Sequence, residues 1–349
     1  MVFLMSAKAA VVGASGYAGG ELVRLLTAHP EIEVATVTGS SSAGEELGAV
    51  QPHLRGSAAG SLVLQATAPE VLAGHDLVFL ALPHGQSAAV AAQLGEDVVV
   101  VDLGADFRLH DAAKWERYYG GSHAGTWPYG LPELPGQRER LQGARRIAAA
   151  GCYPTSVALG LAPLLHAGLV GPTDVVVVAA SGTSGAGRGA KTSLLGSEVM
   201  GAVSTYKAGG SHQHTPEMEQ SLTGAAGTPV VLSFTPLLAP MPRGILATST
   251  ARLRDGVTSE ELRAALATAY AAEPFVTVLP SGVWPSTGAT LGSNAAHLQA
   301  AADTHSGRGV VTVAIDNLGK GAAGQAIQCA NLALDLPEST GLPVVGVAP

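Results

Sequence analysis

The sequence predicts an α/β protein of two domains, in which a parallel-sheet domain opens the chain and an α+β domain follows it. For the first domain, short apolar runs of strand length alternate with helical patterns, and a glycine-rich loop follows the first run. For the second, several strand patterns follow one another after residue 230 with a single helical pattern among them. A chain of 349 residues is long enough for two such domains.

Composition excludes several classes of protein. Charged residues make up 13% and hydrophobic residues 47%, which is typical of a compact enzyme and not of a disordered chain. A net charge of −8 gives no electrostatic basis for binding nucleic acid or an anionic membrane. The two cysteines lie far apart in the sequence, which favours a reducing cytoplasm. Residues 1–5 are apolar but too few for a signal peptide, and no run has membrane-spanning length.

The first predicted strand, residues 9–12, leads into Gly13-Ala14-Ser15-Gly16-Tyr17-Ala18-Gly19 and then a helical pattern. Glycines allow a pyrophosphate to approach the backbone, and the helix N-terminus offers N–H donors. This context predicts a Rossmann-type dinucleotide site, although the spacing is G-x-x-G-x-x-G and a plain turn is the alternative.

The end of the second strand, residues 32–37, indicates which dinucleotide binds. An NAD site usually has Asp or Glu there, whereas this chain has Thr38 and Gly39, followed by Ser40, Ser41 and Ser42. Hydroxyls without a carboxylate suit a 2′-phosphate, which favours NADP(H). The alternative is a polar loop that binds nothing.

Two more strands, residues 76–82 and 98–102, end in loops at the same edge of the sheet. The first loop contains Pro83-His84, which either reaches the cofactor or starts a helix. The second contains Arg108, whose guanidinium suits a phosphate or carboxylate, or forms an ion pair with a neighbouring aspartate.

A strand over residues 146–149 leads to the most informative stretch, Gly151-Cys152-Tyr153-Pro154-Thr155-Ser156. Gly151 permits a tight turn, Pro154 suits the first turn of a helix, and Thr155 and Ser156 are expected to help satisfy the free N–H groups there. Cys152 then lies at the positive end of a helix, which favours the nucleophilic thiolate and an oxyanion beside it. The alternative is a cysteine packed as a small hydrophobic residue.

Two later loops complete the predicted site. A glycine- and serine-rich loop after the strand at residues 174–180 carries Arg188 and Lys191, which suit an anion unless the loop is simply flexible surface. Further on, His212, His214 and Glu217 suggest an acid/base histidine oriented by a carboxylate. No third ligand stands at zinc-site spacing, so we predict no metal.

The strand patterns at residues 230–234, 244–253, 275–279 and 310–315, with one helix at 260–272, predict an antiparallel sheet packed on one face. A last helix, beginning after Asp316 and running to about Leu334, is expected to return to the first domain.

These parts define one reaction class. A dinucleotide site with an activated cysteine and a histidine suits a cysteine thioester that hydride reduces to an aldehyde, or the reverse. Anion-binding loops imply a phosphate on the substrate, and an acyl phosphate offers phosphate as the leaving group.

A series of motifs spans nearly the whole chain: Gly13 to Gly19, Leu82-Pro83-His84-Gly85, Asp102 to Arg108, Gly151-Cys152-Tyr153-Pro154-Thr155, Ser181 to Arg188, His212 to Glu217, and Asp316-Asn317-Leu318-Gly319-Lys320-Gly321. In this order they resemble the N-acetyl-γ-glutamyl-phosphate reductase family of arginine biosynthesis, within the semialdehyde dehydrogenase superfamily. Each motif alone is weak, and together they are specific.

The resemblance implies NADPH-dependent reduction of N-acetyl-γ-glutamyl phosphate to N-acetylglutamate 5-semialdehyde and phosphate. It makes Cys152 the nucleophile and His212 or His214 the acid, with His212 slightly favoured. Gln213 stands where the family often has Arg, which leaves one orienting contact open. Substrate anions would meet Arg108, Arg188 and Lys191. NADP would be held by Gly13, Ser15, Gly16, Tyr17, Ala18, Gly19, Ser40, Ser41, Ser42, Pro83, His84, Ser181, Gly182, Ser184, Gly185 and Asn317.

The resemblance also implies a second domain of the glyceraldehyde-3-phosphate dehydrogenase-like C-terminal type, over residues 152–316. Residues 1–151 and 317–349 would form the NADP-binding domain, and the protein would be a cytoplasmic homodimer or homotetramer. The alternatives are a sister semialdehyde dehydrogenase, acting on aspartyl phosphate or a carrier-bound aminoadipate, and a non-catalytic NADP sensor.

Overall fold

The structure is a computed structural model that describes residues 6–347. The predictions about residues 1–5 therefore lie outside the described residues. By contacts the chain divides into two compact units. The first unit takes the chain up to Pro132, then Gly136–Ala150 and Ala322–Leu342, and the second takes Glu133–Pro135, Gly151–Gly321 and the chain from Pro343.

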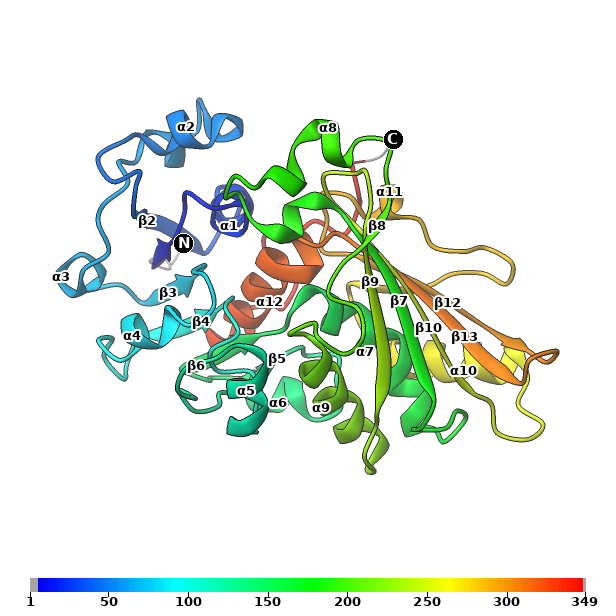
Figure 1. Cartoon of the computed structure of the whole chain (residues 1–349). Helices are drawn as coiled ribbons and strands as arrows, with labels where there is room; N and C mark the ends of the chain where they lie inside the picture. The colour runs from blue at the N-terminus through cyan, green and yellow to red at the C-terminus, as the bar shows by residue number, and fades with distance from the viewer. Residues whose placement is uncertain (1–5, 348–349) are drawn as a thin grey trace. The chain divides into compact units, whose positions relative to one another are not determined.

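The first unit contains a six-stranded sheet in which every pairing is parallel, so the predicted Rossmann-type sheet is confirmed (Figure 1). In sheet order the strands are β2 (Ile32–Thr38), β1 (Ala7–Val12), β3 (Leu77–Leu80), β4 (Val99–Asp102), β6 (Arg146–Ala149) and β5 (Tyr129–Gly130). The central strands, β3 and β4, are fully buried and apolar except for Asp102 at the end of β4, as parallel strands covered on both faces should be.

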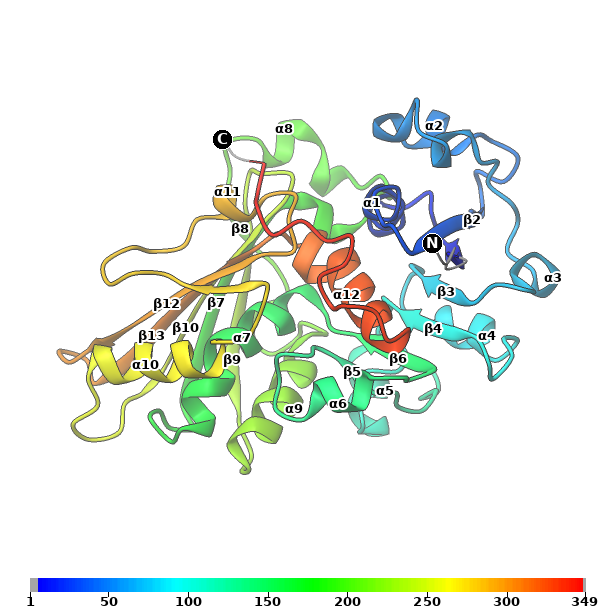
Figure 2. The same cartoon turned by 180° about the vertical axis from the view of Figure 1, so that it is seen from behind.

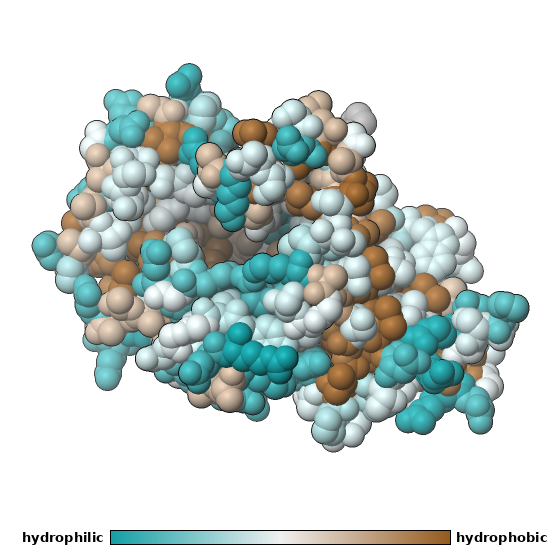
Figure 3. All heavy atoms as spheres, viewed as in Figure 1, coloured by the Kyte–Doolittle hydropathy of each residue, from teal (hydrophilic) through white to brown (hydrophobic). Residues whose placement is uncertain are grey.

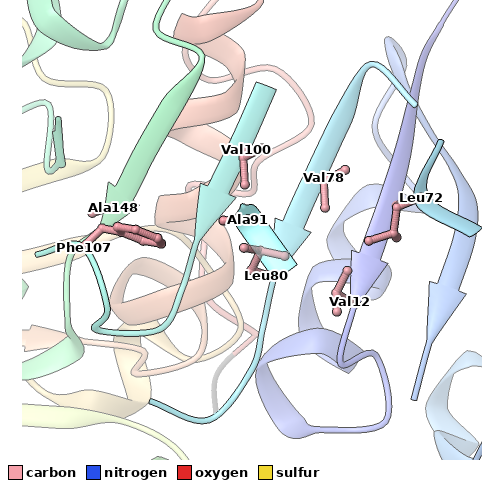
Figure 4. Packing of buried hydrophobic residues seen from close by; sticks show 9 residues of the cluster. Val12, Leu72, Val78, Leu80, Ala91, Val100, Phe107 and Ala148 are labelled. Carbon is pink, nitrogen blue, oxygen red and sulfur yellow. The ribbon is translucent and has the colours of Figure 1, made fainter. Parts of the chain in front are cut away.

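Figure 4 shows part of the core of this unit, in which Val12, Val78, Leu80 and Val100 from neighbouring strands pack with Phe107. On the sheet lie α1 (Tyr17–Leu26) and α12 (Gly324–Ala333), and every residue of α12 is buried. Shorter helices connect the strands: α2 (Leu47–Val50), α3 (Pro69–Leu72), α4 (Ser87–Ala91), α5 (Ala112–Tyr118) and α6 (Gln137–Leu141).

The second unit contains a seven-stranded sheet that is mixed, whereas the sequence predicted an antiparallel one. β7 pairs parallel with β9, and β11 pairs parallel with β12. β12 was not predicted from the sequence, because its alanines have low strand propensity. In sheet order the strands are β11 (Val276–Val278), β12 (Ala296–Asp303), β13 (Arg308–Ile315), β10 (Ile245–Arg252), β7 (Val175–Ser181), β9 (Leu232–Leu238) and β8 (Ser204–Thr205).

One face of this sheet is covered by helices, as Figures 1 and 2 show for α7 (Cys152–His166) and α10 (Ser259–Ala269). α9 (Thr215–Ala226) packs against α7. Along β7 and β10 side chains alternate between this buried face and a more exposed face. Figure 3 shows apolar residues gathered over that second face, where Val178 is 40% exposed. Within residues 6–347, no helix has the length and apolar composition needed to cross a membrane.

The last helix does not begin where the sequence suggested. After β13 the chain makes a π-helical turn, Gly319–Ala323, and α12 starts only at Gly324. The cause is the side chain of Asp316, which accepts hydrogen bonds from the backbone N–H groups of Leu318 and Gly319 and holds a tight turn. Gly151, residues 317–321 and the chain from Pro343 pack with the second unit. The predicted functional boundaries at 151/152 and 316/317 stay a prediction.

Candidate active site

Cys152 is the first residue of α7, directly after an extended Gly151 that ends the turn from β6. The predicted strand, turn and helix are therefore present. The thiol residue is partly exposed and lies at the positive end of a fifteen-residue helix, which favours the thiolate. Because Pro154 has no N–H, the amides of Cys152 and Tyr153 are the donors that the first turn offers.

The predicted caps at Thr155 and Ser156 are wrong. Both residues are fully buried inside the helix, and Ser156 Oγ donates to the carbonyl oxygen of Tyr153. Thr155 Oγ1 has no hydrogen-bond partner among the described residues. The carboxylate of Glu217, in the first turn of α9, instead accepts from the N–H of Gly151 at 2.8 Å. Capping from a distant helix cannot be read from local sequence.

Gly321 is the last residue of a segment, residues 316–321, that packs behind the nucleophile, and we call this segment the wall. A Cβ built on Gly321 would lie 2.8 Å from Cys152 Cβ and 3.3 Å from its Cα. No side chain fits at that separation, so the close packing of these two backbone segments requires glycine.

The two histidines lie side by side in the same unit, with ring centroids 5.0 Å apart. Both are buried, and both meet the ring of Tyr153 edge-on, at 5.4 Å for His212 and 5.9 Å for His214. His212 Nδ1 accepts from the backbone N–H of His214 at 3.0 Å. An accepting Nδ1 assigns the proton of neutral His212 to Nε2, which makes Nε2 the donor.

Tyr206 is a part of this cluster that the sequence analysis did not single out. Its hydroxyl and that of Tyr153 share a hydrogen bond of 2.8 Å, and its ring meets His212 edge-on. Burial raises the pKa of Tyr206 to about 12. Burial, together with the neighbouring phenol of Tyr206 and the charge of Cys152, raises the pKa of Tyr153 further. Both phenols therefore stay protonated at neutral pH. The signal available in the sequence was only the position of Tyr206 just before the histidine motif.

At one end of the second sheet, three loops meet around Asn317. Its Oδ1 accepts from the N–H of Gly244 at 2.7 Å, and its Nδ2 donates to Ser184 Oγ at 3.0 Å. Next to it, Arg243 pairs with the fully buried Asp316 at 3.0 Å, an ion pair that the sequence did not reveal. The amide of Asn317 is thus oriented by the second unit itself.

The predicted substrate cations occupy different settings. Arg108, in the first unit, is buried and donates to the carbonyl oxygens of Ala149 and Leu103 at 2.7 and 2.8 Å. This guanidinium therefore braces the end of β6. Arg188 and Lys191, in the second unit, are exposed in the loop after η3 (Thr183–Ala186), as expected of anion-binding side chains. A role for any of them toward substrate stays a prediction.

The glycine loop of the first unit fits a dinucleotide. Gly13 has a φ of 83°, and a Cβ there would lie 2.4 Å from the carbonyl oxygen of Ala81. A Cβ on Gly19 would lie 2.3 Å from the oxygen of Gly13. Gly16 occupies the N-cap position of α1, where no side chain accepts from the free N–H groups, and the first turn contains no acidic residue. An uncapped helix start of this kind suits a pyrophosphate.

The loops around it are also open to a ligand. Ser40 and Ser41 are exposed, and Ser42 partly so, at the end of β2. Pro83 and His84 are exposed in a loop that Asp106 fixes by accepting from the N–H groups of Gly85 and Ala88, at 2.6 and 3.0 Å.

Two family models match the chain, the semialdehyde dehydrogenase NAD-binding domain over residues 8–144 and the semialdehyde dehydrogenase dimerisation domain over residues 152–317. With the parallel sheet and the cysteine-led helix, they define an oxidoreductase of the semialdehyde dehydrogenase class. The crystal structure of aspartate semialdehyde dehydrogenase II from Vibrio cholerae shares this fold, with a TM-score of 0.70 and 15% identity over 95% of this chain and 99% of that chain.

The relatives narrow the class further. Proteins named N-acetyl-gamma-glutamyl-phosphate reductase from Streptomyces coelicolor and Acidothermus cellulolyticus are each 63% identical over 345 residues, 99% of this chain and 100% of each relative. The chain belongs to the N-acetyl-gamma-glutamyl-phosphate reductase family, and the resemblance seen in the motifs is confirmed.

Proposed function

We propose that the chain catalyses NADPH-dependent reduction of N-acetyl-γ-glutamyl phosphate to N-acetylglutamate 5-semialdehyde and phosphate, a step of arginine biosynthesis. The family and the 63% identity to reductases of that name support the substrate. The observation that carries the chemistry is Cys152 at the start of α7, with its turn held by Glu217 and two histidines beside Tyr153.

Cys152 attacks the acyl carbon as a thiolate, and the carbon–oxygen bond to phosphate breaks with its electron pair leaving on phosphate. A thioester remains on the sulfur. The amides of Cys152 and Tyr153 stabilise the oxyanion of the tetrahedral adduct. The Glu217 carboxylate orients this turn through Gly151, at no cost of reorganisation during the reaction.

His212 is the better candidate for the acid. Its Nδ1 accepts from the N–H of His214, so its proton lies on Nε2, the nitrogen that would donate to the alkoxide that reduction creates. In the Tyr153–Tyr206 pair one hydroxyl donates to the other, and the second hydroxyl supplies a further donor near the charge of the sulfur. When the adduct collapses, the hydroxyl proton returns to His212, the carbonyl forms and the carbon–sulfur bond breaks, which releases the aldehyde and the Cys152 thiolate.

NADPH, when bound, supplies the hydride that reduces the thioester. The residues that would hold it are the glycine loop Gly13–Gly19, the serines at the end of β2, and the Pro83-His84 loop in the first unit. In the second unit, Ser181, Gly182, Ser184 and Gly185 would contribute with Asn317, whose amide is already oriented. Arg188 and Lys191 would meet the substrate anion, and Arg108 would act through the backbone that it braces.

Purified protein incubated separately with N-acetyl-γ-glutamyl phosphate and aspartyl phosphate tests the proposal by the absorbance of NADPH. We expect rapid loss with the first substrate and far slower loss with the second. Consumption with aspartyl phosphate alone would assign the chain to the sister activity, and no turnover with either would favour a sensor.

The more exposed, apolar face of the second sheet supports a homo-oligomer, because a contiguous apolar surface of this kind usually meets a partner. The protein family whose sequence pattern matches residues 152–317 is the semialdehyde dehydrogenase dimerisation domain. We place the enzyme in the cytoplasm, where its nucleophilic thiol would stay reduced. Light scattering of the purified protein distinguishes a monomer from a dimer or tetramer.

A further inference from the structure

The wall, residues 316–321, contains a buried charge, the ammonium of Lys320, directly before Gly321. Gly321, on which a Cβ would lie 2.8 Å from Cys152 Cβ, follows Lys320 in the π-helical turn after β13. The side chain of Lys320 is fully buried, with its ammonium 5.6 Å from the ring centroid of Phe275. A charge in such a place needs a strong partner.

That partner is Glu133. Lys320 Nζ lies 2.5 Å from Glu133 Oε1, and the side chain of Glu133 is also fully buried. Glu133 belongs to a three-residue stretch, Glu133–Pro135, that packs with the second unit although the chain on both sides of it packs with the first. The ion pair therefore ties this inserted stretch to the wall behind Cys152.

Asp316, at the other end of the wall, is also held by hydrogen bonds and an ion pair. Asp316 accepts from the N–H groups of Gly292, Leu318 and Gly319 and pairs with Arg243. In the middle, a Cβ on Gly319 would lie 2.1 Å from the carbonyl oxygen of Ser293, so the segment is pressed against its neighbours. The interactions of Asp316 hold the start of the wall. The Lys320–Glu133 ion pair holds its end, next to Cys152.

Stability alone does not explain a buried ion pair. Removing two charges from water is costly, and replacing such a pair by apolar groups of similar volume is often neutral or stabilising. In some proteins buried polar or ionic groups instead specify a single arrangement of the segments that carry them.

We propose that Glu133 and Lys320 are positioning residues that hold Gly321 against Cys152 and so fix where the thiolate points. For its turnover arm this inference rests on the proposed function. A displacement of about 1 Å at a reacting atom lowers the rate by roughly 100-fold, so a small shift of the wall is enough to be measured.

The test uses the full-length protein with Cys329→Ala, so that iodoacetamide reports on Cys152 alone. The double variant Glu133→Gln with Lys320→Met removes both charges at similar volume and leaves neither unpaired. We expect its kcat and its alkylation rate at neutral pH to fall roughly 10-fold or more, with the KM for NADPH unchanged. The swapped pair, Glu133→Lys with Lys320→Glu, should recover part of both rates.

The matched control is the ion pair of Arg308 and Asp174, at the opposite end of β13. Arg308→Met with Asp174→Asn should leave alkylation and kcat unchanged. Wild-type alkylation and kcat in the neutral Glu133/Lys320 variant would overturn the proposal. If that variant does not fold, Lys320→Arg moves the charged head without removing it, and an unchanged kcat there would equally overturn it. If wild-type protein consumes no N-acetyl-γ-glutamyl phosphate, the proposed function fails while the alkylation comparison still tests the pair.

Discussion

The carboxylate of Glu217 caps the turn that presents Cys152, accepting from the N–H of Gly151 at 2.8 Å. Glu217 lies in α9 and Cys152 in α7, and these two helices pack against each other. The side chain of Glu217 is fully buried, so its charge acts through low-dielectric surroundings. The sequence predicts Glu217 as a partner for histidine, and in the structure its carboxylate holds the backbone directly before the nucleophile.

Replacing Glu217 by alanine should weaken both the fold and the reaction. The buried N–H of Gly151 would lose its acceptor, which costs about 1–3 kcal/mol of unfolding free energy. We expect kcat to fall more than the KM for acyl phosphate rises, because the nucleophile is displaced and not the binding groups. Denaturant unfolding and steady-state kinetics measure the two effects. Glu219→Ala, half-buried on the same helix, is the control and should change kcat little.

Gly321→Ala should disable the enzyme without unfolding it. The added Cβ would lie 2.8 Å from Cys152 Cβ, so one of the two backbone segments must move. We predict a loss of kcat of roughly 100-fold, from displacement of about 1 Å. Gly224→Ala in α9 meets nothing within 4 Å and should be stabilised by about 0.5–1 kcal/mol with normal turnover. Equal activity of the two variants would show that the wall does not position the thiol.

The serines after β2 should set the choice of dinucleotide. Ser41 is exposed at the end of that strand, and a carboxylate placed there would repel a 2′-phosphate. Ser41→Asp should raise the KM for NADPH at least about 10-fold and leave that for NADH nearly unchanged. An unaltered preference, or equal use of both cofactors by the wild-type protein, would remove these serines from the cofactor site.

His29 should make the first unit less stable in acid. Nε2 of His29 is hydrogen-bonded to Oδ1 of Asn331 at 3.0 Å, and its Nδ1 accepts from the N–H of Glu31, so the ring is held neutral. Burial lowers the pKa of His29 below 6.5. Above pH 6.5 both folded and unfolded forms are neutral and the stabilisation is complete. As pH falls from there toward the folded pKa, only the unfolded chain takes up the proton, and stability is lost.

His29→Gln should therefore flatten the dependence of unfolding free energy on pH below 6.5. His53→Gln, at an exposed position, is the control and should keep the wild-type slope. A wild-type slope in His29→Gln would mean that another group causes the acid sensitivity.

Local patterns were enough to predict the first sheet and the helix that begins at Cys152, because both depend on apolar runs, glycine and proline. They were not enough for β12, whose alanines lack a strand signal, or for the π-helical turn that Asp316 holds. The site shows the same division. The residue types at Cys152 and His212 carry a chemical signal of their own. The cap from Glu217, the Lys320–Glu133 pair and the phenol of Tyr206 arise only when distant segments pack together.

The central claim is that Cys152 carries the acyl group as a thioester, and mass spectrometry tests it most directly. The protein is incubated with N-acetyl-γ-glutamyl phosphate in the absence of NADPH, quenched in acid and digested. We predict release of phosphate and an N-acetylglutamyl adduct on the peptide that contains Cys152, with neither from Cys152→Ser. Phosphate release without an adduct on that peptide, or an adduct on Cys329, would contradict the claim.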